Sequence, residues 1–260
     1  MVVHVQGSII KYFCVHYLVS GWMLELRNGA FLKSAVESIS SFIPEGNFRF
    51  SDKGVSFKAI DPSQVVLVDY FVDKKNFDKY LIEPNFVGID IVELNKILQR
   101  ATPLDRLLID ISDSELKLKF ESELKRSFRL SLIDVSEEDI KAPVIEYEAK
   151  VDILALSFKE ILKDAALFGS SVVLKVSDGK FFIEAKGASG VMESEATRVS
   201  TVTTKKEITA KFSLNFLQNI VRQADNEKHI SIELKNDAAM KVSYAIGPGK
   251  MVFYLAHMIL

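Results

Sequence analysis

The stretch Asn28-Gly-Ala-Phe-Leu-Lys-Ser-Ala-Val-Glu-Ser-Ile-Ser-Ser-Phe-Ile43 decides how the first half of the chain folds. Apolar residues recur in it every three or four positions, at Phe31, Ala35, Ile39 and Phe42. This spacing predicts an amphipathic helix with one buried stripe, which Pro44 and Gly46 end. Residues 48–50 and 55–59 then alternate apolar and polar side chains on either side of a turn, as two strands do. The predicted unit is helix, strand, turn, strand.

The same unit returns later in the chain. Helical spacing from Ser157 to Phe168 ends at Gly169, and a hairpin with an Asp178-Gly179 turn follows. The second half of the unit also repeats: a helix begins at Leu94 in one copy and at Leu214 in the other. Three strands follow each of these helices, at 107–111, 115–120 and 127–132, and at 229–234, 240–245 and 251–256. The chain therefore reads as two α+β modules made by domain duplication, because the repeat is too long for a solenoid.

These boundaries divide the chain into four parts. Residues 23–132 form the first domain, and residues 148–260 form the second. The segment 133–147 between them is acidic and contains Pro143, which is the composition of a solvated connector. The apolar residues 1–22 lie outside the duplicated pattern, and we interpret them as an extension that is not part of the fold.

The composition argues against an enzyme. The 260 residues carry a formal net charge of −2, a single cysteine and four histidines that have no metal-ligand spacing. Asp61 follows a strand and is interpreted as a turn former rather than a catalytic acid. Glu137–Asp139 is interpreted as part of an acidic linker rather than a metal site. We therefore predict no catalytic residue, no metal and no cofactor.

The polar faces of the four predicted helices carry basic side chains. These are Lys33, Lys96, Arg100, Lys159, Lys163 and Arg222. Taken alone, they are explained equally well as ordinary solvated helix faces, and Glu37, Glu160 and Asp164 dilute their charge. If duplication places all four helices on one surface, however, that surface can contact phosphates without reading base sequence.

Several stretches resemble the proliferating cell nuclear antigen clamps of archaea and eukaryotes. They are Gly29-Ala-Phe-Leu-Lys33, Gly54-Val-Ser-Phe-Lys-Ala-Ile-Asp-Pro-Ser-Gln-Val-Val-Leu67, Leu94-Asn-Lys-Ile-Leu98, the connector that ends near Pro143, and Tyr254-Leu-Ala256. Their order and spacing extend over residues 23–260. The resemblance implies a duplicated two-domain DNA-clamp fold, with antiparallel outer sheets and inner helices, in one subunit of a trimeric ring.

The resemblance also implies what the ring does and which residues do it. Such a ring encircles duplex DNA, serves as a DNA polymerase processivity factor, and tethers replication and repair proteins. Lys125–Leu132 of one subunit would pair with residues 190–197 of the next. The six basic residues above would line the hole. The groove for partner motifs would comprise Ile60, Gln64, Val65, Leu67, Ile140, Ala142, Ala239, Tyr254, Leu255, Ala256 and His257. Because Ala142, Ala239 and His257 depart from the family pattern, we expect a shallower or differently selective groove.

The partners that the resemblance implies are double-stranded DNA, other clamp subunits, DNA polymerase, the clamp loader, flap endonuclease and DNA ligase, with no membrane. The location would be cytoplasmic and nucleoid-associated in an archaeon, or nuclear in a eukaryote. Two alternatives stay open at this point. The chain is then either a specialised subunit of a heterotrimeric clamp, or a duplicated α+β interaction module that does not bind DNA.

Overall fold

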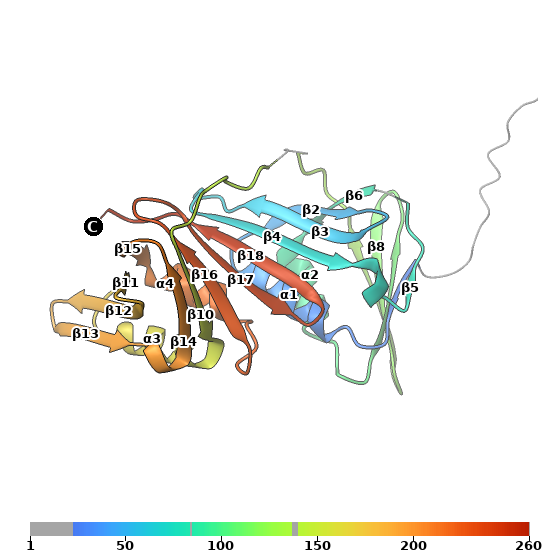
Figure 1. The fold of residues 1–260 in the computed structure, drawn as a ribbon. Coiled ribbons are helices and arrows are strands. Elements are labelled where there is room, and N and C mark those ends of the chain that lie inside the picture. The colour runs from blue at the N-terminus through green and yellow to red at the C-terminus, as the bar shows by residue number, and fades with distance from the viewer. Residues whose placement is uncertain (1–22, 84, 137–139, 260) are drawn as a thin grey trace, which may run out of the picture.

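The computed structural model describes residues 23–83, 85–136 and 140–259 (Figure 1). The proposed extension, residues 1–22, lies outside this part of the chain. In the part that is described, no helix is both long and apolar enough to cross a membrane.

The two predicted modules are present and share one order of elements. The first contains β1 (Leu24–Leu26), α1 (Ala30–Ser40), β2 (Glu45–Phe50), β3 (Gly54–Ile60), β4 (Val66–Asp73), β5 (Lys79–Tyr80), β6 (Asn85–Asp90), α2 (Ile91–Leu98), β7 (Arg106–Ile111), β8 (Glu115–Glu121) and β9 (Lys125–Ser131). The second contains β10 (Ala149–Leu154), α3 (Ala155–Ala165), β11 (Ser171–Ser177), β12 (Lys180–Gly187), β13 (Gly190–Glu195), β14 (Ser200–Thr204), β15 (Ile208–Ser213), α4 (Leu214–Val221), β16 (His229–Leu234), β17 (Met240–Ile246) and β18 (Gly249–Leu255). Each element of one module therefore has a counterpart in the other, which confirms the duplicated α+β fold.

The alignment of the second helices differs from the sequence-based one. Helix α2 begins at Ile91, three residues before Leu94, whereas α4 begins at Leu214. The Asp90 carboxylate accepts a hydrogen bond from the Glu93 amide at 2.8 Å and so caps the first turn of α2. The shared Leu-Asn pair misled the comparison, because Ile91 and not Leu94 corresponds to Leu214.

The strands form three sheets in the described chain. The orders are β5-β1-β7-β8-β9, β14-β10-β16-β17-β18-β4-β3-β2-β6, and β13-β12-β11-β15. The long central sheet joins five strands of the second module to four strands of the first. The joint is the antiparallel pair β18 and β4, in which Phe253 lies opposite Val68 and Tyr254 lies opposite Leu67. One continuous sheet therefore links the two modules.

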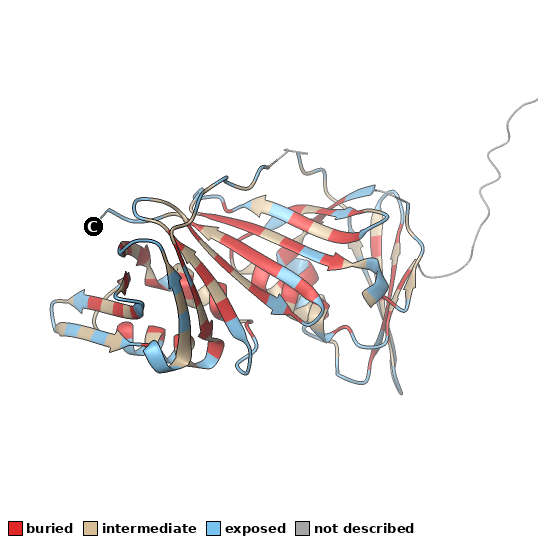
Figure 2. Ribbon diagram, viewed as in Figure 1, coloured by how far each residue is buried: buried red, intermediate tan, exposed pale blue. Residues whose placement is uncertain are grey.

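The tight turn between β2 and β3 depends on a glycine. Gly54 has φ +147°, and a Cβ there would lie 2.1 Å from the Val72 carbonyl oxygen. Only a residue without a side chain fits so close to the neighbouring strand. Along the strands, buried and exposed residues alternate, so that one face of each sheet packs on the core (Figure 2).

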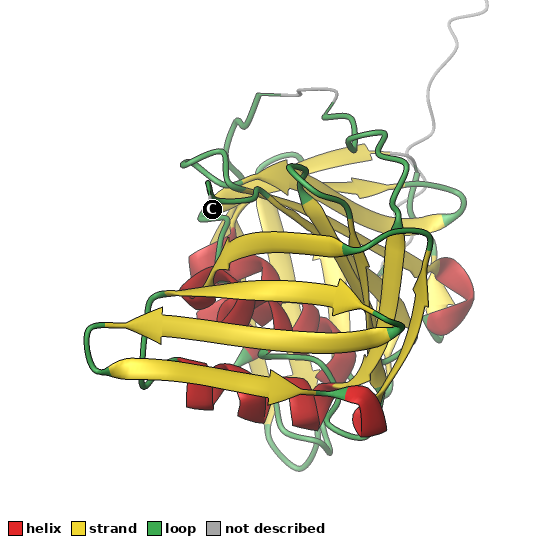
Figure 3. Cartoon of the chain, turned by 60° about the vertical axis from the view of Figure 1, so that its left-hand side comes forward, coloured by secondary structure: helices red, strands yellow, loops and turns green. Residues whose placement is uncertain are grey.

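The four helices form a single row, α2-α1-α4-α3. Helices α1 and α2 pack together in the first module, as do α3 and α4 in the second. Between the modules, the Phe42 ring after α1 stacks on Phe216 of α4, with 6.1 Å between ring centroids. Tyr244 of β17 donates a hydrogen bond to the Ile220 carbonyl in α4 at 2.6 Å and accepts one from Ser38 in α1 at 3.2 Å. Figure 3 shows the helices behind the strands of the outer layer.

Candidate functional site: a helix row and a seam groove

The helix row brings the predicted basic residues onto one side of the molecule. Lys33 lies on α1, Lys96 on α2, Lys159 and Lys163 on α3, and Arg222 directly after α4. We call this side the helix-row surface. The glutamates and the aspartate among these residues, Glu37, Glu93, Glu160 and Asp164, lie on the same helices. The surface is therefore positive only by a small margin.

Lys33 and Lys159 hold helix ends within the chain. Lys159 Nζ donates to the Ala224 carbonyl at 2.6 Å and to Asn226 Oδ1 at 2.8 Å. Lys33 Nζ lies 3.5 Å from the Gln99 carbonyl, the equivalent place in the first module. The last carbonyls of a helix have no partner within it and carry partial negative charge. Burial lowers the pKa of the Lys159 amine, so this lysine is less available to phosphates than the sequence suggested.

Lys96 and Lys163 are held in another way. Lys96 Nζ lies 2.6 Å from Glu93 Oε1, and Lys163 Nζ lies 2.6 Å from Glu160 Oε1. The hydrogen bond from Glu93 raises the pKa of Lys96, so this lysine keeps its charge. Both pairs are exposed, and such pairs contribute only about 0–1 kcal/mol. A phosphate can therefore take the place of the glutamate at little cost.

The two arginines differ in their surroundings. The Arg222 guanidinium donates to the Asn219 side-chain oxygen. The Arg100 side chain is exposed, while its carbonyl oxygen accepts a hydrogen bond from Arg126 at 2.8 Å.

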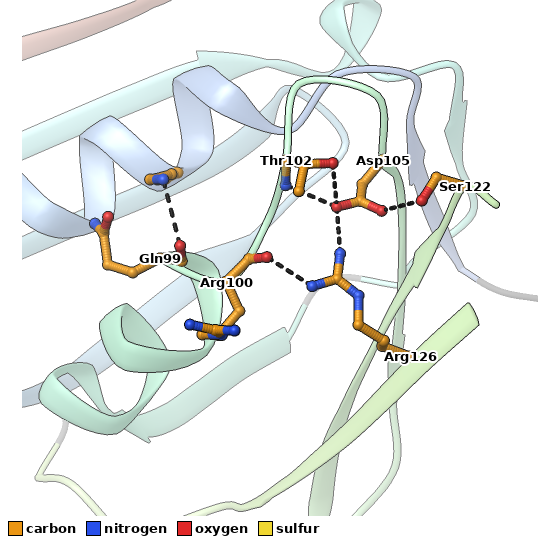
Figure 4. A network of polar contacts seen from close by, with 7 residues as sticks. Gln99, Arg100, Thr102, Asp105, Ser122 and Arg126 are labelled. Atoms are coloured by element: carbon orange, nitrogen blue, oxygen red, sulfur yellow. Dashed lines mark hydrogen bonds and ion pairs between the residues drawn. The ribbon is translucent and has the colours of Figure 1, made fainter. Parts of the chain in front are cut away.

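A polar network fastens this end of α2 to strand β9 (Figure 4). The buried Asp105 carboxylate accepts hydrogen bonds from the Thr102 amide at 2.7 Å, from Ser122 at 2.8 Å and from Arg126. Burial by itself would raise the pKa of this carboxyl, but the hydrogen bonds outweigh it and hold that pKa below its usual range. The network therefore ties the helix-row surface to an edge of the molecule.

The residues assigned to the partner groove gather around one end of the joint between β4 and β18. Leu67 lies opposite Tyr254 in one pair and opposite Ile60 in another. The Ala256 amide donates to the Val65 carbonyl at 2.9 Å. Leu67 and Leu255 are buried. Ile60, Gln64 and His257 are exposed, and Val65, Ile140, Ala142, Ala239, Tyr254 and Ala256 are half-buried. Leu67 and Leu255 thus support the surface from beneath.

Asp61 shapes the loop that carries Gln64 and Val65. Its carboxylate accepts hydrogen bonds from the Val65 and Val66 amides at 2.7 and 2.6 Å, and from the Ser63 amide at 3.1 Å. Burial opposes its ionisation, yet the hydrogen bonds from Ser63, Val66 and Val65 lower its pKa. Gln64 has a positive φ of 59°. Asp61 therefore has a structural role in the turn, as the sequence indicated.

The connector crosses the outer face of the first module (Figure 1). The Ile133 amide donates to the Gly88 carbonyl at 3.0 Å, and Asn47 Nδ2 donates to the Val135 carbonyl at 3.0 Å. A hollow of about 640 Å³ lies beside it, and Ile60 and Ile140 form part of its wall. The described part of the connector contains no helix or strand.

Three structurally important residues escaped the sequence analysis: Tyr244, Asp105 and Arg126. Tyr244 read as one apolar position of a strand, and Asp105 read as a loop residue. The pattern Thr102-x-x-Asp105 is a weak signal for a side-chain cap, but nothing local indicates that Arg126 reaches it. The described chain contains no group of three or more His, Cys, Asp or Glu side chains suited to a metal ion.

A duplicated α+β chain, with one row of helices on one side and unpaired strands at both ends, defines the class of ring-forming DNA clamps. The profile described as proliferating cell nuclear antigen, N-terminal domain, matches residues 23–142, and the profile of the C-terminal domain matches residues 141–259. The DNA polymerase sliding clamp of Methanococcus vannielii is 32% identical over 238 residues, which are 88% of this chain and 96% of that protein. DNA polymerase sliding clamp 1 of Thermococcus kodakarensis is 30% identical over 228 residues, with 85% and 92% covered. The chain belongs to the proliferating cell nuclear antigen family.

Proposed function

We propose that this chain is a subunit of a sliding clamp that encircles duplex DNA and raises the processivity of a DNA polymerase. The sliding-clamp class follows from the family, and the protein is a scaffold, not an enzyme. The alternative of an interaction module that does not bind DNA is not favoured. One observation carries the proposal at residue level: the four helices share one row, and basic side chains are spaced along it.

The ring is proposed from the two unpaired edges. Within the described residues, β9 ends one sheet and β13 ends another, and neither has a neighbour on its outer side. Exposed edges invite pairing with another chain, and a closed ring removes them. We propose that β9 of one subunit pairs with β13 of the next, and that three subunits close the ring.

DNA would pass along the helix-row surface. Lys96, Arg100, Lys163 and Arg222 are the proposed phosphate contacts, and Lys33 and Lys159 contribute mainly by holding the helices. Weak contacts from long side chains have nearly equal energy at every position along the duplex, so they permit sliding. Retention on DNA then comes from the closed ring.

A polymerase extension assay on primed circular DNA tests this assignment. Replacing Lys96, Lys163 and Arg222 together with alanine should shorten extension products and lower clamp loading while leaving ring assembly intact. Unchanged loading and processivity would contradict the assignment of these three residues.

Partner proteins would bind at the groove beside the joint of β4 and β18. DNA polymerase is the partner that the relatives' names imply; the clamp loader, flap endonuclease and DNA ligase are further proposals. The exposed Ile60 and half-buried Ile140 offer apolar surface to a short motif with an aliphatic and an aromatic residue. Because these relatives are archaeal clamps, we expect the protein to act on DNA in the cytoplasm.

The groove assignment predicts that Ile140→Ala weakens binding of such peptides by about 1–2 kcal/mol, since apolar contact area is lost. Isothermal titration calorimetry measures this, and native mass spectrometry shows whether the ring is retained. A peptide affinity equal to that of the wild type would remove Ile140 from the groove.

A further inference from the structure

The joint between β18 and β4 inside the chain is a template for a joint between two chains. Strand β9 is the counterpart of β18, and β13 is the counterpart of β4. Joining β9 to β13 of another copy unites a five-stranded sheet with a four-stranded one, which is the composition of the central sheet. The internal pairing therefore specifies the register of the external one.

The pairs in β8 and β9 fix the alignment on one side. Phe128 lies opposite the buried Leu118, just as Phe253 lies opposite the buried Val242, so Phe128 corresponds to Phe253. On the other side, Met192 lies opposite Ala185, just as Val68 lies opposite Ala59. Since Phe253 faces Val68 in the internal joint, Phe128 should face Met192 of the next copy.

An aromatic contact supports this register. In the internal joint, Phe42 lies 5.6 Å from Phe253, measured between ring centroids. The counterpart of Phe42 is Phe168, because each of the two amides donates to the carbonyl three residues earlier, Ile39 or Ala165, at the end of the first helix. Phe168 and Phe128 are both half-buried in the isolated chain. The register brings these two rings together across the joint.

Charges on the solvent side of the two strands are opposite in sign. The exposed residues of β9 are Lys125, Ser127, Arg129 and Ser131, and those of β13 are Val191, Glu193 and Glu195. The internal pairs Lys250 with Phe71 and Val252 with Asp69 translate into Lys125 with Glu195 and Ser127 with Glu193. Glu193 then lies between Lys125 and Arg129, within reach of both.

The core side of the joint agrees. Arg126 takes the place of Met251, which faces Tyr70 internally, so Arg126 would face Ser194. Within the described chain, the buried Nε of Arg126 has no hydrogen-bond partner. The Ser194 hydroxyl of a neighbouring copy could accept that bond.

We infer that β9 binds β13 of a second copy of this same chain, through Lys125 and Arg129 on one side and Glu193 and Glu195 on the other. This inference rests on the proposed ring and identifies its neighbour. A subunit specialised for a mixed ring has no need of two mutually complementary edges on one chain, whereas a subunit that binds itself does. The partner is therefore another copy, and a paralogous chain is not required.

Charge reversal in the full chain tests the inference, with native mass spectrometry as the readout. The variant K125E/R129E and the variant E193K/E195K each place like charges at every joint, and each should weaken association roughly tenfold or more per joint. The fourfold variant that carries all these changes restores complementarity and should form rings again. Mixed with the wild type, it should form separate rings, because each mixed joint repels.

Two further measurements keep the outcome decisive if a variant fails to fold, which thermal unfolding will reveal. The wild-type ring should dissociate more readily as salt rises toward 1 M, where charges are screened beyond about 3 Å. Double variants that are folded and associate as the wild type does would overturn the ion pairs, and so would a ring indifferent to salt. A folded fourfold variant that stays monomeric would overturn the register.

The same experiment separates this inference from the proposed function. A wild-type chain that is monomeric alone but forms rings with a paralogue refutes self-recognition and leaves the clamp function standing. A wild-type chain that forms rings alone but gives no processivity on circular DNA does the reverse.

Discussion

Replacing Glu93 and Glu160 with glutamine should strengthen the grip of the ring on DNA. In each of the two exposed pairs, the glutamate oxygen lies 2.6 Å from the lysine amine. The substitution frees Lys96 and Lys163, and it also removes two negative charges from the helix-row surface of each subunit. Since the pairs are exposed, the change should cost the fold little.

The magnitude follows from counterion release. Each additional phosphate contact steepens the plot of log K against log salt by about 0.9, which is about a three- to fourfold change in affinity between 50 and 200 mM salt. A ring of three subunits gains two free lysines per subunit, and only those near the duplex contribute. We therefore expect the slope to steepen by at least about 1 and the affinity at 50 mM salt to rise by at least about threefold.

Fluorescence anisotropy with a linear duplex, at several salt concentrations, measures both quantities. Glu233→Gln is the matched control. Glu233 pairs with Lys241 at 2.7 Å on β16, between the buried Ile232 and Leu234, so it points away from the helices. The control should match the wild type. If E93Q/E160Q also matches the wild type while its ring remains intact, the helix-row surface does not face DNA.

Two further predictions concern stability. Tyr244→Phe should lower the free energy of unfolding by about 1–3 kcal/mol, because Ser38 and the Ile220 carbonyl lose a buried partner; Tyr70→Phe, whose buried hydroxyl has no partner in the described chain, should be neutral or stabilising in the same thermal melts, and equal losses would contradict this account. Asp105→Asn should cost about 2–4 kcal/mol at neutral pH. Because the folded pKa of Asp105 is lowered from 3.8, its stabilisation is fully present above that pH and is lost as pH falls below it, so urea unfolding should show the gap between wild type and D105N narrowing under acid. A gap that stays constant with pH would contradict the role given to the carboxylate.

Much of the fold was predictable because it depends on local pattern. The helix at Phe31–Phe42 and the hairpin at Asp178-Gly179 each follow from a few neighbouring residues. The comparison of the two modules went wrong at Leu94 and Leu214, where a shared Leu-Asn pair was a weaker guide than the cap at Asp90. Helix spacing placed Lys33 and Lys159 on polar faces, but spacing cannot show that their amines reach the carbonyls of another helix.

The sequence by itself determined the duplication, the class of each module and the residue types along the helix faces, since these follow from the periodicity of side chains along a strand or helix. Only the tertiary structure decided that β18 joins β4, that four helices share one row, and that Asp105 holds Arg126. Each of these depends on contacts between segments far apart in the chain, which no local period encodes. The same long-range joint, read from one module to the other, is what points to a second copy as the neighbour in the ring.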